Sequence, residues 1–509
     1  MNANTEGRAQ AASAGERELP AKLCFFDDYW IDFRKGTTRR WFQPEAAASF
    51  RDPDFMATVY CSAAWCPEVG KYRLWYEASP DLANDAVRYL CLAESEDGVN
   101  FAPVDVNDHP ERRMRRVVFD GGSGLHGSSV IRDPHDPDPS RRYKCATMIN
   151  MGAHGNGESC PVILAFSPDG VHWTARPDLV AHPYTSDALN TLYYNPIQQD
   201  YGLLMRGGYV DRRIALRRSK DMQEWSEPQI ILHPSPAYNS DAQEVQFYSM
   251  WAGWMDGVFL GLLWRYNTSM TDMDFTKLFG YMETELIYSY DGLHWMQTSG
   301  NLVVDRPLPP QYGCAQLSLM GMYETSAGDA YILHGFGAKF MHGTPENNRR
   351  LNDRLNGDSS ATVFYRIRKD GYCGIEGLAE GSTIITKPLQ FTAAELTVNV
   401  RAGAGYARFG MMRKDGSYFD GFAFDDCVPF EGDDCAAVPQ WKERRLEELV
   451  GEQVRIAIEL NGAILHAITL AARPDIVKPQ ASFGNPMQID DAAAKTAYAK
   501  QQQDGTIPF

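Results

Sequence analysis

The chain has 509 residues, 44% of them hydrophobic and 23% charged. This composition is typical of folded domains and not of a disordered tract. Its formal net charge at pH 7 is −17, which disfavours binding to nucleic-acid phosphates and to anionic membrane surfaces. The sequence contains no apolar run long enough for a transmembrane helix. We therefore expect neither nucleic acid nor a membrane as a partner.

Residues 1–22 are polar and rich in alanine, and they predict a flexible N-terminal arm without a secretory signal. The ten cysteines are scattered, and their spacing matches no zinc site. We interpret them as reduced, mostly buried thiols and expect a cytoplasmic protein without a metal.

A short pattern, Ser-x-Asp-(Gly)-x-x-aromatic, repeats along the first two thirds of the chain. The copies are residues 95–101, 167–173, 219–225 and 289–295, with a degenerate fifth copy at 369–372. Serine and aspartate side chains bond nearby backbone groups in a tight turn, and glycine accepts a positive φ there. An apolar strand precedes each turn, and two further strands lie upstream of it.

Three strands and a turn, repeated in this way, predict an all-β fold: a five-bladed β-propeller over residues 23–372. The innermost strands are expected to begin near residues 55, 127, 190, 246 and 315. Residues 23–31 would supply the outer strand that closes the last blade. Alternating apolar and polar residues with glycine-rich turns then predict a C-terminal β-sandwich over residues 373–472, followed by an extended tail, 473–509.

Several segments carry a family resemblance. Residues 25–29, 72–76, 126–130, 421–427 and 438–442 look like a sparsely characterised bacterial branch of the furanosidase-type glycoside hydrolases, the superfamily of invertases, levanases, arabinanases and β-xylosidases. The resemblance spans residues 23–470. It implies a glycoside hydrolase that cleaves a small glycoside or oligosaccharide, possibly a furanoside, with carboxylates at the propeller axis.

In that superfamily a base or nucleophile, a transition-state stabiliser and a proton donor project from the starts of innermost strands. The resemblance assigns these roles to Asp54, Asp187 and Glu244, with Asp52 as an alternative to Asp54. The second blade opens with His126 and no acid, which departs from the family pattern. Each of these acids has a structural alternative, as a turn residue or a solvated loop acid.

The residues expected to bind substrate are Asp52, His126, Asn190, Arg206 and Gln246. Arg206 could instead form an ion pair between blades, and His126 could be a structural histidine. Asp133 follows its strand inside a turn rich in Asp and Pro, and we assign it to the fold.

Two other functions remain open at this stage. A related glycoside phosphorylase would need a basic phosphate pocket, for which Arg206, Arg212 and Arg213 are available. A non-catalytic propeller that binds carbohydrate or protein is the second alternative. No cofactor is expected: a central Ca²⁺ is conceivable in a propeller, but no ligand motif supports it. The sequence carries no signal for the oligomeric state.

Overall fold

The computed structural model describes residues 21–80, 87–121, 124–149, 159–207, 212–234, 243–269, 280–302, 304–342 and 358–474. Their regular structure is β-strand with a few short 3-10 helices, so the expected all-β class is confirmed. In these ranges no helix is long and apolar enough to cross a membrane. The described residues fall into two compact units, 41–373 and 21–40 with 374–474.

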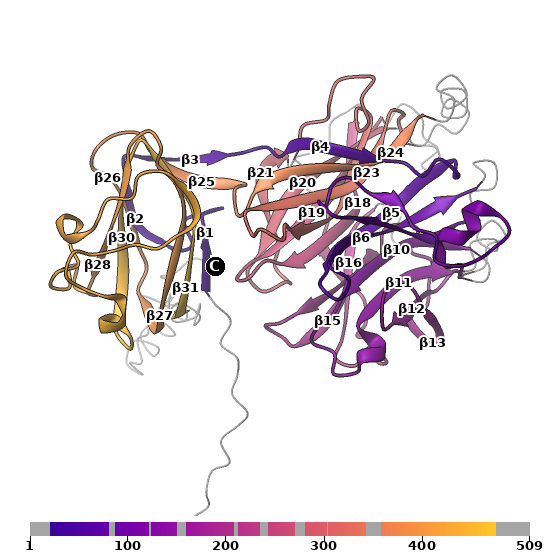
Figure 1. Ribbon diagram of the computed structural model, residues 1–509, viewed down its shortest axis with the longest axis horizontal. Coiled ribbons are helices and arrows are strands. Elements are labelled where there is room, and N and C mark those ends of the chain that lie inside the picture. The colour runs from indigo at the N-terminus through magenta and orange to yellow at the C-terminus, as the bar shows by residue number, and fades with distance from the viewer. Residues whose placement is uncertain are drawn as a thin grey trace, which may run out of the picture. The chain divides into compact units, whose positions relative to one another are not determined.

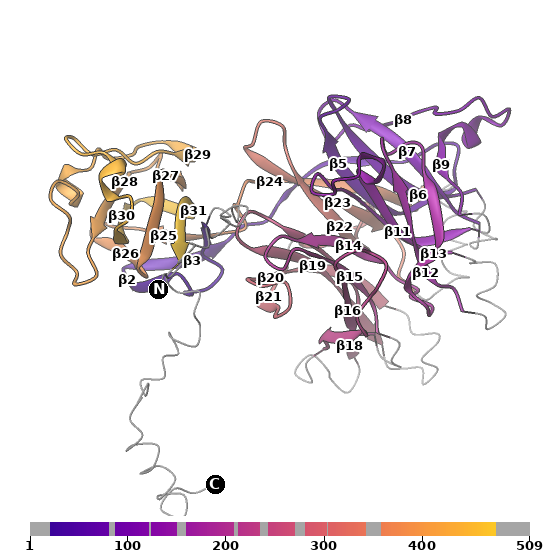
Figure 2. The same cartoon turned by 90° about the horizontal axis from the view of Figure 1, so that it is seen from below.

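The first unit contains four sheets, whose strands are labelled in Figure 1 and Figure 2. One sheet has the order β5 (Ala57–Cys66), β6 (Lys71–Ser79), β7 (Tyr89–Ser95) and β8 (Ala102–Pro103), with β9 (Val117–Phe119) also on β7. The next is β10 (Leu125–Arg132), β11 (Tyr143–Ile149), β12 (Val162–Ser167) and β13 (Thr174–His182). The third is β14 (Thr191–Asn195), β15 (Asp200–Arg206), β16 (Ile214–Ser219) and β17 (Gln229–Leu232).

The fourth sheet joins two antiparallel sets through a single parallel pairing, Met282 with Gln316. The first set is β18 (Gln243–Trp254), β19 (Phe259–Ser269), β20 (Gly280–Ser289) and β21 (Met296–Leu302). The second set is β22 (Gln316–Glu324), β23 (Ala330–Ala338), β24 (Ser360–Arg368) and β4 (Glu45–Phe50).

The first strands of these sets, β5, β10, β14, β18 and β22, contact one another in chain order, and β22 also contacts β5. They begin at residues 57, 125, 191, 243 and 316, each within about three residues of the start expected from the sequence, which is the usual uncertainty of a strand boundary. Ser62 and Ser129 link successive strands, because their hydroxyls accept hydrogen bonds from Val130 N (2.9 Å) and Leu192 N (3.0 Å).

The strand that completes the last set is not the one expected. β4 pairs with β24, whereas β1 (Ala21–Cys24) pairs with β31 (Ala463–Pro474) and β2 (Ile31–Lys35) pairs with β26 (Ser382–Thr386), all in the second unit. The first unit therefore starts near residue 41 and not at residue 23. β4 is mostly exposed and rich in alanine. It therefore lacks the run of large apolar residues on which the prediction for residues 23–31 was based.

The repeated turn has the local hydrogen bonds that its sequence predicts. In the copy at 167–173, the Asp169 carboxylate accepts from the backbone N–H groups of Val171 (2.9 Å) and His172 (2.8 Å), and Gly170 N donates to Ser167 Oγ (2.8 Å). Gly170 has a φ of +76°, which a residue with a side chain adopts only at a cost.

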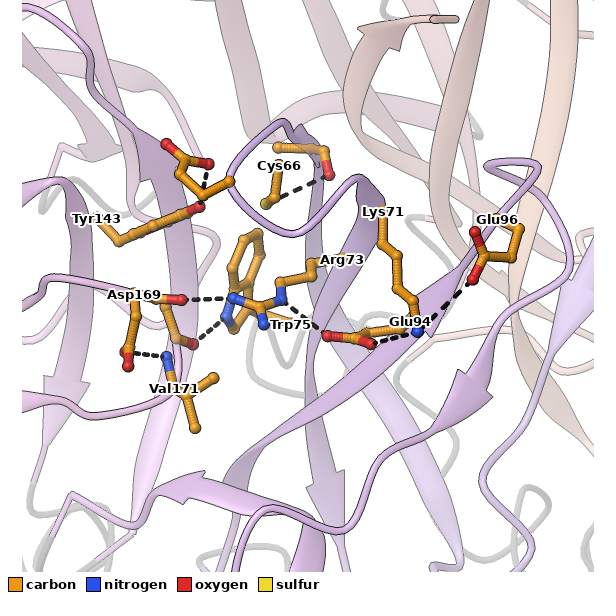
Figure 3. A network of polar contacts seen from close by, with 12 residues as sticks. Cys66, Lys71, Arg73, Trp75, Glu94, Glu96, Tyr143, Asp169 and Val171 are labelled. Atoms are coloured by element: carbon orange, nitrogen blue, oxygen red, sulfur yellow. Dashed lines mark hydrogen bonds and ion pairs between the residues drawn. The ribbon is translucent and has the colours of Figure 1, made fainter.

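These turns also bind the preceding sheet. The indole N–H of Trp75 on β6 donates to the carbonyl oxygen of Gly170 (2.7 Å), and Arg73 donates to that of Asp169 (Figure 3). The same contact recurs elsewhere: Tyr193 Oη donates to the carbonyl of Gly292 (3.4 Å), and Tyr323 Oη donates to that of Gly98.

The second unit is built from ten paired strands. On one side β31 pairs with β1, β25 (Cys373–Gly377) and β27 (Leu389–Arg401), and β27 pairs with β29 (Asp433–Ala437). On the other side β30 (Gln453–Asn461) pairs with β26 and β28 (Tyr406–Met412), and β26 with β2. β3 (Thr37–Trp41) lies beside β25. Of the arm expected at 1–22 and the tail expected at 473–509, residues 1–20 and 475–509 lie outside the described residues, whereas residues 21–22 belong to β1 and residues 473–474 to β31.

Replacing Gly170 by alanine tests the contact between the turn and the preceding sheet. An added Cβ would lie 2.7 Å from Trp75 Cζ2 at a positive φ, whereas in Gly70→Ala the φ is +64° and nothing lies within 4 Å. We expect Gly70→Ala to lower the free energy of unfolding by about 1 kcal/mol and Gly170→Ala by about 2–4 kcal/mol. Urea denaturation measures both; equal losses would contradict the role of the contact.

The turn aspartates make stability depend on acid pH. Burial raises the pKa of Asp169, but hydrogen bonds from His172, Val171 and Ser167 outweigh it and bring the pKa to about 2. A lowered pKa adds stability above the unfolded value near 3.9, and this is lost as the pH falls through the folded value. The urea concentration at the unfolding midpoint should therefore be lower for Asp169→Asn than for the wild type at pH 7. The two midpoints should approach each other as the pH falls from ~4 to ~2. Asp108→Asn, at an exposed position, is the control for the removal of a surface carboxylate.

Candidate active site

Asp187 is a solvent-facing carboxylate held between two basic side chains. It lies just before β14, and its side chain is 41% exposed. Oδ1 is 3.0 Å from Nε2 of His126 on β10, and Oδ2 accepts from Nη1 of Arg206 at the end of β15 (3.3 Å). His126 and Arg206 are 6% and 15% exposed, so the carboxylate is the open member of the group.

A buried glutamate lies on the other side of His126 from Asp187, near the second ring nitrogen of the histidine. Glu77 near the end of β6 is fully buried and accepts a hydrogen bond from Ser128 N (2.6 Å). Its Oε2 is 3.5 Å from Nη1 of Arg88 and 3.9 Å from Nδ1 of His126, and Arg88 also contacts that imidazole nitrogen. We call Glu77, Arg88, His126, Asp187 and Arg206 the Asp187 cluster.

Glu77 was not among the residues singled out from the sequence. An available signal was its place in β6, a strand that is otherwise apolar and buried between Leu74 and Ala78. A charged residue in such a strand needs a partner. That partner could not be identified without the contact between β6 and β10.

The close approach of two backbones places His126 beside Asp187. Gly127 has a φ of +66°, and a Cβ there would lie 1.9 Å from the carbonyl oxygen of Ala188. Asn190 N donates to Gly127 O (2.8 Å), and the Asn190 amide donates to Gly127 O (3.2 Å) and Ala188 O (3.1 Å). Asn190 is fully buried. Its amide therefore supports this loop, and its expected role as a substrate ligand stays a prediction.

Arg206 also belongs to a second group on the neighbouring strands. Its guanidinium carbon lies 4.8 Å from the ring centroid of Tyr248 on β18, and that of Arg212, just before β16, lies 5.1 Å from the same ring. Arg212 Nη1 donates to Oε1 of buried Gln246 (2.5 Å). We call Arg206, Arg212 and Tyr248 the arginine–tyrosine platform.

Aromatic side chains pack around both groups. Tyr60 on β5 meets the His126 ring edge-on at 4.9 Å, and Trp264 on β19 stacks between Tyr60 and Tyr248 at 6.3 Å from each. Burial raises the pKa of Tyr60 well above its usual value and also raises that of Tyr248. Both phenols therefore stay protonated at neutral pH and can donate hydrogen bonds.

Asp52 and Asp54 form a separate group. Asp52 is buried, accepts from Tyr76 Oη (2.6 Å) and contacts Arg116, which also lies 2.6 Å from Asp54 Oδ2. Tyr76 and Glu77 are consecutive on β6, so their side chains point to opposite faces of the strand. No described hydrogen bond or ion pair joins Asp54 to Asp187.

The site residues predicted from the sequence thus fall into three sets. The structure brings His126, Asp187 and Arg206 together, and Gln246 reaches them through Arg212. Asp52 and Asp54 share Arg116 instead. The side chain of Glu244 lies outside the described residues, and a common pocket for Asp54, Asp187 and Glu244 stays a prediction. Within the described ranges, no three His, Cys, Asp or Glu side chains form a group that could hold a metal.

Comparisons with known proteins give structural likeness only. No protein family and no curated protein matches the sequence. Solved structures similar to this chain include an N-acetylgalactosamine deacetylase from F. plautii in complex with blood group B trisaccharide, with 12% identity, a TM-score of 0.42, and coverage of 66% of this chain and 96% of that one. A glycosyl hydrolase from Bacteroides ovatus has 11% identity, a TM-score of 0.37, and coverage of 68% and 92%.

A β-fructofuranosidase from Schwanniomyces occidentalis complexed with fructosyl-erythritol has 9% identity, a TM-score of 0.37, and coverage of 85% of this chain and 98% of that one. Glycoside hydrolases are therefore among the structural neighbours. The identities and TM-scores are too low to transfer a substrate, a residue role or a mechanism to this chain.

Glu77 and Asp187 should differ in their effect on stability. Glu77→Gln removes a fully buried carboxylate beside Arg88, and we expect a loss of about 3 kcal/mol in the free energy of unfolding. Asp187→Asn changes a half-exposed ion pair and should cost less than about 1 kcal/mol. Guanidinium denaturation of the two variants checks this. A loss at Asp187→Asn as large as at Glu77→Gln would show that Asp187 serves mainly to hold the fold.

Proposed function

We propose that the protein is a glycoside hydrolase and that Asp187 is one of its catalytic carboxylates. The observation that carries the proposal is the placement of Asp187: an open carboxylate, fixed by His126 and Arg206, at the edge where strands of successive sheets begin. We further propose that the sheets of residues 41–373 are the five blades of a propeller and that the second unit is a β-sandwich. The contacts of β5, β10, β14, β18 and β22 in chain order, with β22 back on β5, support the propeller.

Hydrolysis of a glycoside adds water across the bond between the anomeric carbon and the leaving oxygen. One acid protonates that oxygen, one carboxylate takes a proton from water or attacks the sugar, and the transition state resembles an oxocarbenium ion. A negative charge at Asp187 stabilises that cation. In this proposal Glu244 donates the proton and Asp54 is the base or nucleophile.

The Asp187 cluster suits such a role physically. His126 and Arg206 bind different oxygens of the carboxylate, so its orientation is set before substrate arrives. A carboxylate that is already oriented does not have to be reorganised during the reaction, which lowers the free energy of the transition state. Glu77 acts one step away, because it holds His126 and Arg88 and not the substrate.

Asp187→Asn tests the proposal directly. With a panel of chromogenic furanosides and pyranosides as substrates, we expect kcat/KM to fall at least about 100-fold, while the fold is retained. Asp178→Asn is the matched control, because Asp178 also pairs with an arginine, Arg176, and is 61% exposed. Wild-type activity in Asp187→Asn would refute the role of Asp187, and no hydrolysis of any glycoside by the wild type would refute the proposed function.

Variants of Glu244 and Asp54 separate the remaining roles within the same assay. Glu244→Gln should spare substrates with very good leaving groups, since these need no protonation, whereas Asp54→Asn should abolish turnover of all substrates. Loss of activity in Asp52→Asn together with an unaffected Asp54→Asn would move the base two residues along the same loop.

A further inference from the structure

Arg212 forms no ion pair with a carboxylate of the described residues. The two arginines of the Asp187 cluster have carboxylate partners: Arg88 lies 3.5 Å from Glu77, and Arg206 lies 3.3 Å from Asp187. The hydrogen bond of Arg212 is to the neutral amide of Gln246. A guanidinium stays protonated in proteins, so the arginine–tyrosine platform and Asp187 together hold an excess of one positive charge in a chain whose net charge is −17.

The platform also has unused hydrogen-bond donors. Nε of Arg212, and Nε and Nη2 of Arg206, are buried and make no hydrogen bond within the described part of the chain. Burial, followed by the charge of Arg206, lowers the pKa of Arg212. Leaving charged donors buried without acceptors is costly, and a bound anion would remove that cost.

Aromatic rings surround the two guanidinium groups. Both lie over the ring of Tyr248, and Arg212 also lies 5.3 Å from the ring of Tyr266. His342 packs edge-on against both rings, and burial together with Arg212 lowers its pKa to about 4. His342 is therefore neutral at pH 7, and the positive charge here comes from the arginines.

We propose that Arg212, together with Arg206, binds a carboxylate of the substrate, and that the substrate class is a glycoside of a uronic acid. This inference rests on the proposed function, because it places the sugar beside Asp187. A guanidinium fork matches the two oxygens of a carboxylate. The charges of Arg206, Arg212 and Asp187 leave a single excess positive charge, which one carboxylate neutralises. A phosphate or sulfate is the alternative anion, and a phosphate dianion would be repelled more strongly by the nearby Asp187.

Binding of non-reacting ligands to the intact wild-type chain tests the inference without relying on hydrolysis. Isothermal titration calorimetry at pH 7 would compare the methyl glycosides of glucuronic and galacturonic acid with methyl glucoside and methyl galactoside, and with inorganic phosphate and sulfate. We expect at least one uronide to bind about 10-fold or more tightly than its neutral counterpart, the effect of one charge-assisted contact. Equal binding of acid and neutral sugars, or no binding of either, would overturn the inference. Tighter binding of phosphate or sulfate than of either uronide would also overturn it, and phosphate would point to a phosphorylase.

Variants then localise the effect. Arg212→Gln should remove the preference for the uronide, and Arg212→Lys should keep part of it, because the charge remains and the fork is lost. Arg176→Gln is the control for net charge, since Arg176 is exposed and pairs with Asp178 on β13. A preference unchanged in a folded Arg212→Gln would refute the assignment. Uronide binding without hydrolysis of any glycoside would refute the proposed function alone, and hydrolysis of neutral glycosides without uronide preference would refute this inference alone.

Discussion

The contact between a turn and the preceding sheet is the interaction on which the first unit depends. In the turns at Gly98, Gly170 and Gly292, the glycine carbonyl accepts a hydrogen bond from an aromatic side chain of the preceding sheet, Tyr323, Trp75 or Tyr193. The donors are buried, so each bond also satisfies a polar group that burial would otherwise leave unpaired. One local motif thereby closes its own turn and joins two sheets.

This arrangement separates stability from chemistry. Each turn follows the end of the third strand of its set, for example Ser95 on β7 or Ser167 on β12. The Asp187 cluster and the arginine–tyrosine platform lie at the opposite ends of the strands, where β7 and β16 begin and β6 and β15 end. Substitutions in the site can therefore change chemistry while the turns still hold the sheets together.

Charge balance distinguishes structural from functional polar groups. Lys144 is fully buried, but Asp133 at 2.8 Å and Asp136 at 3.0 Å balance it, and Tyr201 donates to Asp133. This network supports the structural role expected for Asp133 in its turn. Arg212, which is half-buried, lacks such a partner among the described residues. The charge of Lys144 is thus compensated by its own neighbours, whereas a ligand would be needed to balance the charge of Arg212 in our proposal.

The sequence alone determined the all-β class, the repeated turn and the starts of the first strands, because these depend on local chemistry: an Asp side chain bonds residues two and three positions ahead, and apolar runs form strands. It also pointed to His126, Asp187 and Arg206. Only the tertiary structure decided that β4 closes the last set, that Glu77 anchors His126, and that Asp54 pairs with Arg116. These depend on partners distant in the chain, whose packing no local pattern encodes.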